Sequence, residues 1–153
     1  MAMPEGIDFV IVRENLEDLY LGLEGDIEEL TALNYYSRHA RANLSDLGPG
    51  KYAIKAITER GSERVIRHSF ELARQRNNKR KVTVTCKYNM LSTADGLFLK
   101  TAKHVAQDYP DITFEHFIVD DFLCRMIARP HDLDVVVTPN LYCLLYTSDA
   151  ADE

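Results

Sequence analysis

Four short apolar runs lie along the chain, at residues 9–12, 82–86, 112–119 and 133–137, and they limit the folds open to it. β-Branched and aromatic residues dominate these runs, which is typical of buried strands. Segments whose apolar residues recur at helical spacing separate the last three runs. Strands that alternate with helices form layered α/β folds in which at least part of the sheet is parallel. The chain is therefore expected to adopt an α/β fold.

The segments beside these runs predict the remaining elements. Helices are expected over residues 61–77, 92–109 and 120–129, from apolar spacing and from turn or capping residues at their ends. Weak alternation of apolar and polar residues predicts two further strands, at residues 19–23 and 51–59. Residues 24–50 show the least regular pattern of the chain.

Three of the runs are followed by a residue that can take part in chemistry. Arg13 follows the first run, Lys87 the second and Asp120 the third, and Tyr20 lies shortly after Arg13. Arginine can clamp a carboxylate, because its guanidinium is planar and permanently charged. Tyrosine and lysine can move protons, and aspartate can hold a divalent metal ion.

Each of these residues also has an ordinary structural interpretation. Arg13 and Glu14 could form a surface ion pair, which is the commoner role of such a pair after a strand. Tyr20 could be a half-buried strand residue, Lys87 a solvated strand end, and Asp120 the N-cap of the following helix. Only their order along the chain and their sequence context favour a functional interpretation.

The ordered set of motifs resembles the metal-dependent β-decarboxylating dehydrogenases, the isocitrate and isopropylmalate dehydrogenase family. The resemblance covers nearly all of residues 6–142. It rests on residues 10–15 with Tyr20, 57–62, 86–89, 109–111, 119–120 and 134–142. No single motif is very specific, but their order along the chain is.

The resemblance implies a role for each candidate residue. Arg13 matches the arginine that binds the substrate carboxylate, and Tyr20 matches the general acid. Lys87 matches the general base, and Asn89 matches an asparagine near the substrate and the nicotinamide. Asp120 matches a ligand of the Mg²⁺ or Mn²⁺ ion, which polarises the carbonyl. The implied cofactors are NAD or NADP together with that divalent ion.

The resemblance also implies an architecture and an assembly. Residues 1–142 are expected to form a partial isocitrate/isopropylmalate dehydrogenase domain, made of the smaller domain with its dimer arm and part of the central sheet. In this family, residues of the Lys87 and Asp120 type reach into the site of the neighbouring subunit. A homodimer with shared active sites is therefore expected.

The tail of the chain departs from the family pattern. Residues 143–153 resemble a translated transposase-type sequencing adapter, and we expect them to be non-native. Asp149 and Asp152 are not assigned as metal ligands, because their spacing differs from that of the aspartate pair in the family. We also expect the piece to be inactive, since that pair, two further arginines and the adenine-binding part would lie outside it. Genomic reads that run through codon 143 would contradict a foreign tail.

The expected reaction is the oxidative decarboxylation of isocitrate. Residues 13–15 followed by Glu17 resemble the isocitrate branch more than the isopropylmalate branch. Tyr88 is unusual in either branch, so 3-isopropylmalate, tartrate, malate and homoisocitrate remain alternatives. Two competing classes are a non-catalytic regulatory subunit of the same family and an unrelated α/β binding module.

Charge and cysteine content bear on partners and location. A formal net charge of -6 and a pI near 5.4 argue against nucleic-acid or anionic-membrane binding. No apolar stretch is as long as a membrane span, and the first residues lack the features of a signal peptide. The three cysteines follow no zinc or redox spacing, and Cys86 and Cys124 are expected to be buried thiols. The thiols fit a reducing cytoplasm or a mitochondrial-type matrix, and a cytoplasmic location is expected. One basic run, residues 74–81, is interpreted as a helix end and loop.

Overall fold

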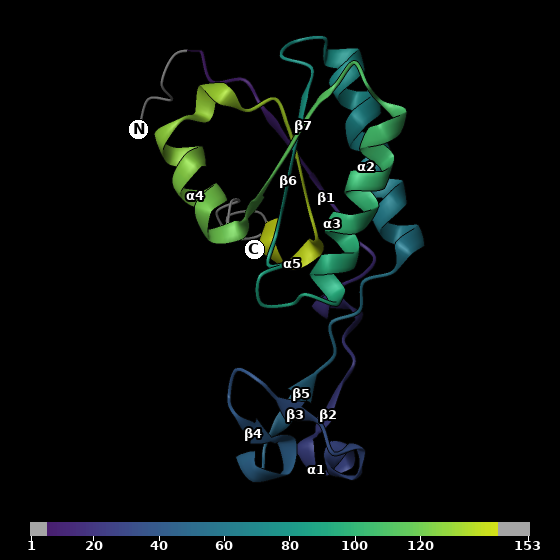
Figure 1. The fold of residues 1–153 in the computed structure, drawn as a ribbon, viewed down its shortest axis with the longest axis vertical. Coiled ribbons are helices and arrows are strands. Elements are labelled where there is room, and N and C mark those ends of the chain that lie inside the picture. Colours follow the sequence, from purple (N-terminus) through teal and green to yellow (C-terminus); the bar gives the residue numbers. More distant parts are fainter. Residues whose placement is uncertain (1–5, 144–153) are drawn as a thin grey trace, which may run out of the picture.

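The body of the molecule is a parallel sheet covered by helices, as a computed structural model that describes residues 6–143 shows. Strands β1 (Val10–Arg13), β8 (Val135–Thr138), β6 (Lys81–Cys86) and β7 (Thr113–Ile118) lie in that order. Each neighbouring pair is parallel (Figure 1). The α/β fold and the four expected strands are thus confirmed.

The helices lie on both faces of this sheet. Helices α2 (Glu59–Arg76) and α3 (Ala94–Val105) cover one face, and α4 (Val119–Ala128) covers the other (Figure 1). A short helix, α5 (Asn140–Cys143), follows β8. Two 3₁₀ turns, Ala106–Asp108 and Pro130–Asp132, follow α3 and α4.

The sheet side chains divide into two cores because successive residues of a strand point to opposite faces. Val135 and Val137 pack with α2 and α3, whereas Val136 packs with Phe122 of α4. All four of these side chains are fully buried. This two-sided burial explains why the strand is a continuous apolar run with no polar alternation.

Helix α2 begins two residues earlier than the sequence pattern suggested, because Thr58 caps it. The Thr58 hydroxyl accepts a hydrogen bond of 3.0 Å from the amide of Gly61. A side chain at Gly61 would collide with the carboxylate of Glu17, which itself accepts a 2.8 Å bond from the amide of Thr58. At the other end, Asn77 adopts a left-handed conformation with φ 46 and ends the helix, as expected.

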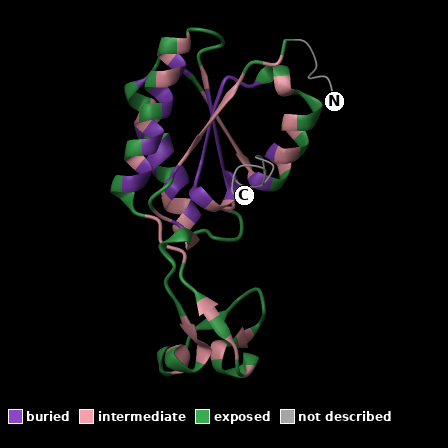
Figure 2. Cartoon of the chain, turned by 180° about the vertical axis from the view of Figure 1, so that it is seen from behind, coloured by how far each residue is buried: buried purple, intermediate pink, exposed green. Residues whose placement is uncertain are grey.

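The arm, residues 19–57, extends away from the body (Figure 1). It contains two small antiparallel sheets, together with α1 (Ile27–Leu30) and the 3₁₀ turns Leu19–Leu21, Thr31–Leu33 and Leu44–Leu47. The sheets pair β2 (Glu24–Asp26) with β5 (Lys51–Ala53), and β3 (Tyr36–Ser37) with β4 (Ala42–Asn43). No residue of the arm is buried (Figure 2).

Three expectations from the sequence are wrong. Residues 19–23 form no strand: a 3₁₀ turn capped by the Asp18 carboxylate takes their place. The strand expected at residues 51–59 is only β5, because the chain beyond Ala53 leaves its partner strand to re-enter the body. Cys124 is exposed, whereas Cys86 is buried as expected.

The basic run at the end of α2 is a paired structural element. Arg76 donates 2.9 Å and 2.7 Å hydrogen bonds to the carboxylates of Asp134 and Asp8, and Arg74 pairs with Asp111. This confirms its interpretation as a helix end and loop.

None of the described helices is long and apolar enough to cross a membrane. Of the tail expected to be non-native, only Cys143 lies within the described residues.

Candidate active site

The candidate residues gather at the carboxyl edge of the parallel sheet. Arg13 is the last residue of β1, Lys87 directly follows β6, Asp120 lies in the first turn after β7, and Asn140 follows β8. Parallel strands end at one edge, where α/β proteins commonly bind their ligands. The side chains form two groups at this edge, one around Arg13 and one around Lys87.

In the first group, Arg13 is held from two sides. Its Nε donates a 2.8 Å hydrogen bond to Oδ1 of Asn140, and its guanidinium carbon lies 5.4 Å from the centre of the Tyr20 ring. Asn140 is 1% exposed and its amide nitrogen donates to the carbonyl of Glu17 at 3.1 Å. The two terminal nitrogens of Arg13 make no hydrogen bond to another residue of the described range, and such a pair of nitrogens can bind a carboxylate in a bidentate manner.

The turn after Arg13 is fixed by a buried acid. Glu14 is 3% exposed, and both of its carboxylate oxygens lie 2.9 Å from Nη2 of Arg64. The same carboxylate accepts a 2.7 Å bond from the amide of Leu16. Arg13, Glu14, Arg64 and His68 help to line an open hollow of about 550 Å³ beside β1. The sequence interpretation of Arg13 and Glu14 as an ion pair is wrong, because Glu14 pairs with Arg64 instead.

In the second group, Lys87 and Asp120 form an ion pair across the ends of β6 and β7. Their side chains are 27% and 59% exposed, so both are accessible to a ligand. Asp120 does not cap α4, whose N-cap is Ile118. Its carboxylate is in the first turn of that helix, where the helix dipole favours a negative charge.

Asn89 is separate from both groups. It lies in an exposed turn in which the amides of Met90 and Leu91 donate to the carbonyl of Lys87 at 3.0 Å and 2.9 Å. Its side chain forms no hydrogen bond or ion pair with the other candidate residues, all of which lie in the described range. The structure therefore joins Arg13 with Tyr20, and Lys87 with Asp120, but leaves Asn89 apart.

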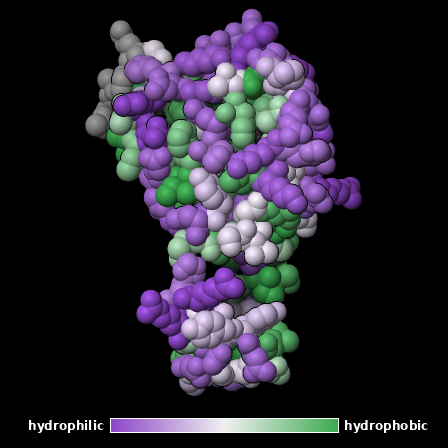
Figure 3. All heavy atoms as spheres, viewed as in Figure 1, coloured by the Kyte–Doolittle hydropathy of each residue, from purple (hydrophilic) through white to green (hydrophobic). Residues whose placement is uncertain are grey.

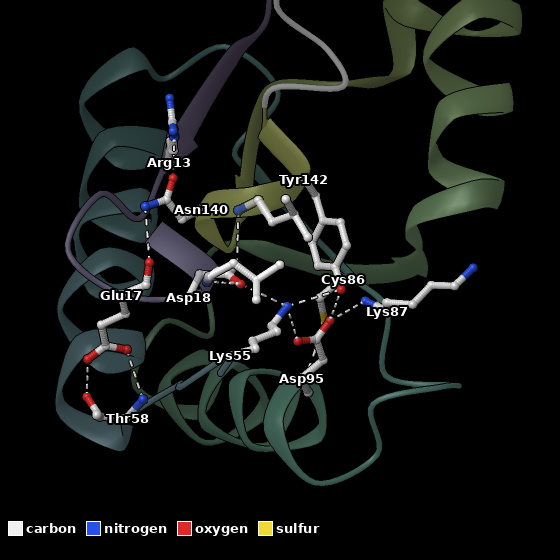
Figure 4. A network of polar contacts seen from close by, with 12 residues as sticks. Arg13, Glu17, Asp18, Lys55, Thr58, Cys86, Lys87, Asp95, Asn140 and Tyr142 are labelled. Carbon is white, nitrogen blue, oxygen red and sulfur yellow. Dashed lines mark hydrogen bonds and ion pairs between the residues drawn. The ribbon is translucent and has the colours of Figure 1, made fainter. Parts of the chain in front are cut away.

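A buried polar network between the two groups was missed by the sequence (Figure 4). The Lys55 ammonium lies 2.7 Å from Oδ1 of Asp95, 3.4 Å from Oδ1 of Asp18 and 3.1 Å from the Tyr142 hydroxyl. The Tyr142 hydroxyl donates to Oδ2 of Asp95 at 2.8 Å, and the amide of Lys87 donates to the same oxygen at 2.6 Å. These residues are too widely separated in sequence to form a recognisable motif.

Burial dominates the titration of this region. It raises the pKa of the Tyr142 phenol, and the hydrogen bond to Asp95 adds to the effect. Burial also raises the pKa of the Cys86 thiol to about 12, which disfavours the thiolate form that acts as a nucleophile. Near the Lys87 group, the Tyr88 hydroxyl lies 3.3 Å from Nδ1 of His116, whose pKa is lowered by burial.

Within residues 6–143, no three acidic, histidine or cysteine side chains are close enough to hold a metal ion together. Asp120 offers one carboxylate, and the adjacent Asp121 pairs with Arg125 at 2.8 Å. Magnesium requires about six oxygen ligands, some of which are water. The described residues alone therefore do not fit a complete metal site.

Comparison with known proteins identifies relatives of the chain. The model of the isocitrate/isopropylmalate dehydrogenase family matches residues 1–151. The mitochondrial regulatory subunit 1 of the NAD isocitrate dehydrogenase of Arabidopsis thaliana is 38% identical over 96% of the chain and 35% of its own length. The 3-isopropylmalate/3-methylmalate dehydrogenase of Methanocaldococcus jannaschii is 38% identical over 95% of the chain and 39% of its own length.

A solved structure agrees with these relatives. The crystal structure of isocitrate dehydrogenase from Methylococcus capsulatus superimposes with a TM-score of 0.71 and 36% sequence identity. The match covers 90% of this chain and 36% of that one. The chain therefore spans little more than a third of the length of these proteins.

Proposed function

The chain belongs to the isocitrate/isopropylmalate dehydrogenase family, and on that premise we propose that its complete enzyme oxidatively decarboxylates isocitrate, using NAD or NADP. The observation that carries this proposal is the Arg13 group. Asn140 and the Tyr20 ring hold the guanidinium, and its terminal nitrogens make no hydrogen bond to another residue of the described range 6–143. A planar, permanently charged donor in that state suits a substrate carboxylate.

Two side chains are proposed to move protons. Lys87 accepts the proton of the substrate hydroxyl as the alcohol is oxidised, and the nicotinamide would take the hydride. Loss of carbon dioxide then leaves an enolate, and the Tyr20 hydroxyl protonates its carbon. Tyr20 is 51% exposed and lies against Arg13, so its hydroxyl can reach a substrate bound there.

Asp120 is proposed to be one ligand of a Mg²⁺ or Mn²⁺ ion, and Asn89 to contact the substrate and nicotinamide. Both side chains are exposed at the carboxyl edge of the sheet. Residues 6–143 of one chain offer no cluster of three such side chains, so the other metal ligands are proposed to come from other parts of the complete enzyme, from the partner subunit or from water. When bound, the ion would stabilise the negative charge on the enolate oxygen.

We propose a homodimer in which the arm of each copy packs against the other. Exposed large apolar residues are concentrated on and near the arm: Leu21, Leu23, Leu33, Tyr35, Tyr36, Leu47 and Ile54, each at least 41% exposed. Figure 3 shows hydrophobic atoms on the surface of this part. Contiguous apolar surface on a folded protein commonly marks an interface. In the proposed dimer, the Lys87 group of one copy completes the Arg13 group of the other, as the resemblance to the family implies.

A regulatory subunit is the second candidate, because one relative at 38% identity is named as such. Tyr20, Lys87 and Asp120 together favour catalysis, since a subunit without chemistry has no need for all three. The substrate is also a proposal: 3-isopropylmalate, tartrate, malate and homoisocitrate are the alternatives, and a relative acting on 3-isopropylmalate is equally similar.

The chain alone is proposed to be inactive, since it spans 35% of the length of a relative and holds no complete metal site among its described residues. A cytoplasmic location is proposed as well. It is supported by Cys86, a buried thiol, which suits a reducing compartment.

An assay of the complete enzyme tests the proposal. Purified enzyme with Mn²⁺ and either NAD or NADP is expected to reduce the nucleotide with isocitrate and to release carbon dioxide. Tyr20→Phe and Lys87→Met should each lower kcat by about a hundredfold or more, whereas Tyr35→Phe, on the arm, should leave it unchanged. Activity on another 2-hydroxy acid alone would refute the substrate, and a complete enzyme with no turnover would favour the regulatory subunit.

A further inference from the structure

Lys55 lies where the arm rejoins the body, two residues after the end of β5. Its side chain is only 11% exposed. The ammonium contacts Asp95, Asp18 and the hydroxyl of Tyr142, and it also lies 4.4 Å from the centre of the Tyr142 ring. A lysine from the arm is therefore anchored in the body (Figure 4).

The two carboxylates beside Lys55 make displacement of its ammonium group energetically costly. Both Asp18 and Asp95 are fully buried, at 0% exposure, and they share this one ammonium. Oδ1 of Asp95 has no well-aligned hydrogen bond, so its stabilisation is ionic and comes from Lys55 at 2.7 Å. A buried carboxylate that loses its partner is strongly destabilised. Displacement of Lys55 would therefore oblige both carboxylates to move or to take up water.

The two carboxylates hold the backbone of both groups of candidate residues. Asp95 accepts the amide of Lys87 at 2.6 Å. Asp18 accepts the amide of Leu19 at 2.8 Å, directly before Tyr20, and the amide of Leu141 at 3.0 Å. Residue 141 follows Asn140, which in turn holds Arg13.

We propose that Lys55 is a positioning residue that couples the seating of the arm to both halves of the candidate site. It touches no reacting atom: it fixes the two aspartates, and they fix the backbone beside Tyr20 and at Lys87. This role rests on the proposed function, because only then do Tyr20 and Lys87 need fixed positions. An arm seated by a partner subunit would thereby order the catalytic edge of its own chain.

Amide NMR and hydrogen exchange on the 153-residue chain test this coupling. Lys55→Met should shift the resonances of the Lys87 and Leu141 amides, and raise their exchange roughly tenfold or more relative to core amides such as Val84. Lys55→Arg, which keeps the cation, should restore protection. Lys51→Met is the matched control: this lysine is also on the arm and ion-paired, but its side chain is 77% exposed. It should leave the amides unchanged.

The wild-type chain provides a second readout that needs no variant. In low concentrations of urea, the Leu19, Lys87 and Leu141 amides should exchange through one shared opening with one free energy and one urea slope. Three unrelated opening energies, or unchanged Lys87 and Leu141 amides in a folded Lys55→Met chain, would overturn the coupling. A uniform loss of protection at every amide in that variant would also overturn it. None of these readouts depends on catalysis, so the coupling and the proposed reaction can fail separately.

Discussion

The body and the arm differ in how their structure is stabilised. In the body, two strands, β6 and β8, and two long helices, α2 and α3, bury fully enclosed side chains, including Phe70, Val84 and Val137. In residues 19–60, which include the arm, no residue is buried, although apolar side chains are common there (Figure 2). The body is thus stabilised by its own core, whereas the arm is held by small sheets and caps and leaves its large apolar side chains exposed.

Truncation of a core residue should give the largest difference between the two regions. Phe70 is fully buried and stacks on Tyr109 with ring centres 4.9 Å apart. Phe70→Ala should lower the free energy of unfolding by about 3–5 kcal/mol. Tyr36→Ala, on the exposed arm, should change it by less than about 0.5 kcal/mol. Urea unfolding of both variants measures this, and equal losses would remove the distinction between body and arm.

The second-largest difference in the free energy of unfolding is expected between the loss of a buried ion pair and the loss of an exposed one. Asp134 is fully buried, pairs with Arg76 at 2.9 Å and accepts the amide of Lys79 at 3.1 Å. Asp134→Ala should cost about 3 kcal/mol, because it leaves these donors without their acceptor. Lys51→Ala removes the exposed arm pair with Asp26 and should cost less than about 1 kcal/mol. Thermal unfolding compares them, and a larger loss from Lys51→Ala would contradict the ranking.

The arm should matter more for association than for folding. Tyr35 and Tyr36 are 61% and 58% exposed. Replacing both with serine should raise the dissociation constant of the dimer about tenfold, because aromatic side chains supply much interface energy. Sedimentation equilibrium measures this, with Gln107→Ser, exposed on the body, as a control. Unchanged association in the double variant would show that the arm does not carry the interface.

The smallest effect concerns pH and one half-buried histidine. Burial lowers the pKa of His116 below its usual 6.5, so folding favours the neutral ring. Between 6.5 and the lower pKa of the folded chain, the unfolded chain binds more protons, and stability falls as pH drops through that window. His116→Gln should remove this fall, whereas His39→Gln, exposed on the arm, should not. Unfolding curves at several pH values test it, and identical slopes would contradict it.

The strands and helices of the body could be predicted from the sequence, because the spacing of their apolar residues and their end residues are local features of the chain. The valine-threonine run at residues 82–86 became β6, and Asn77 ended α2 as its left-handed conformation allows. The sequence predictions failed where contacts with distant parts of the chain determine the local structure. Residues 19–23 follow the Asp18 cap and not their weak alternation, and residues 54–59 leave the sheet for the body.

The candidate site was predictable only in part. Order along the chain was enough to select Arg13, Tyr20, Lys87 and Asp120, and the structure places them as two pairs. The network around Lys55 could not be predicted, because its members lie on separate elements and no spacing connects them. Only the fold shows that one arm lysine lies between two buried aspartates.

We propose that a complete site draws Tyr20 from one subunit and Lys87 from its partner. Mixing inactive Tyr20→Phe and Lys87→Met forms of the complete enzyme, then dissociating and reassociating the subunits, tests it directly. A mixed dimer would contain one site with both wild-type residues, so random reassociation should restore about a quarter of wild-type activity. No recovery, with mixed dimers verified by mass spectrometry, would contradict the claim and place both residues in a site within one subunit.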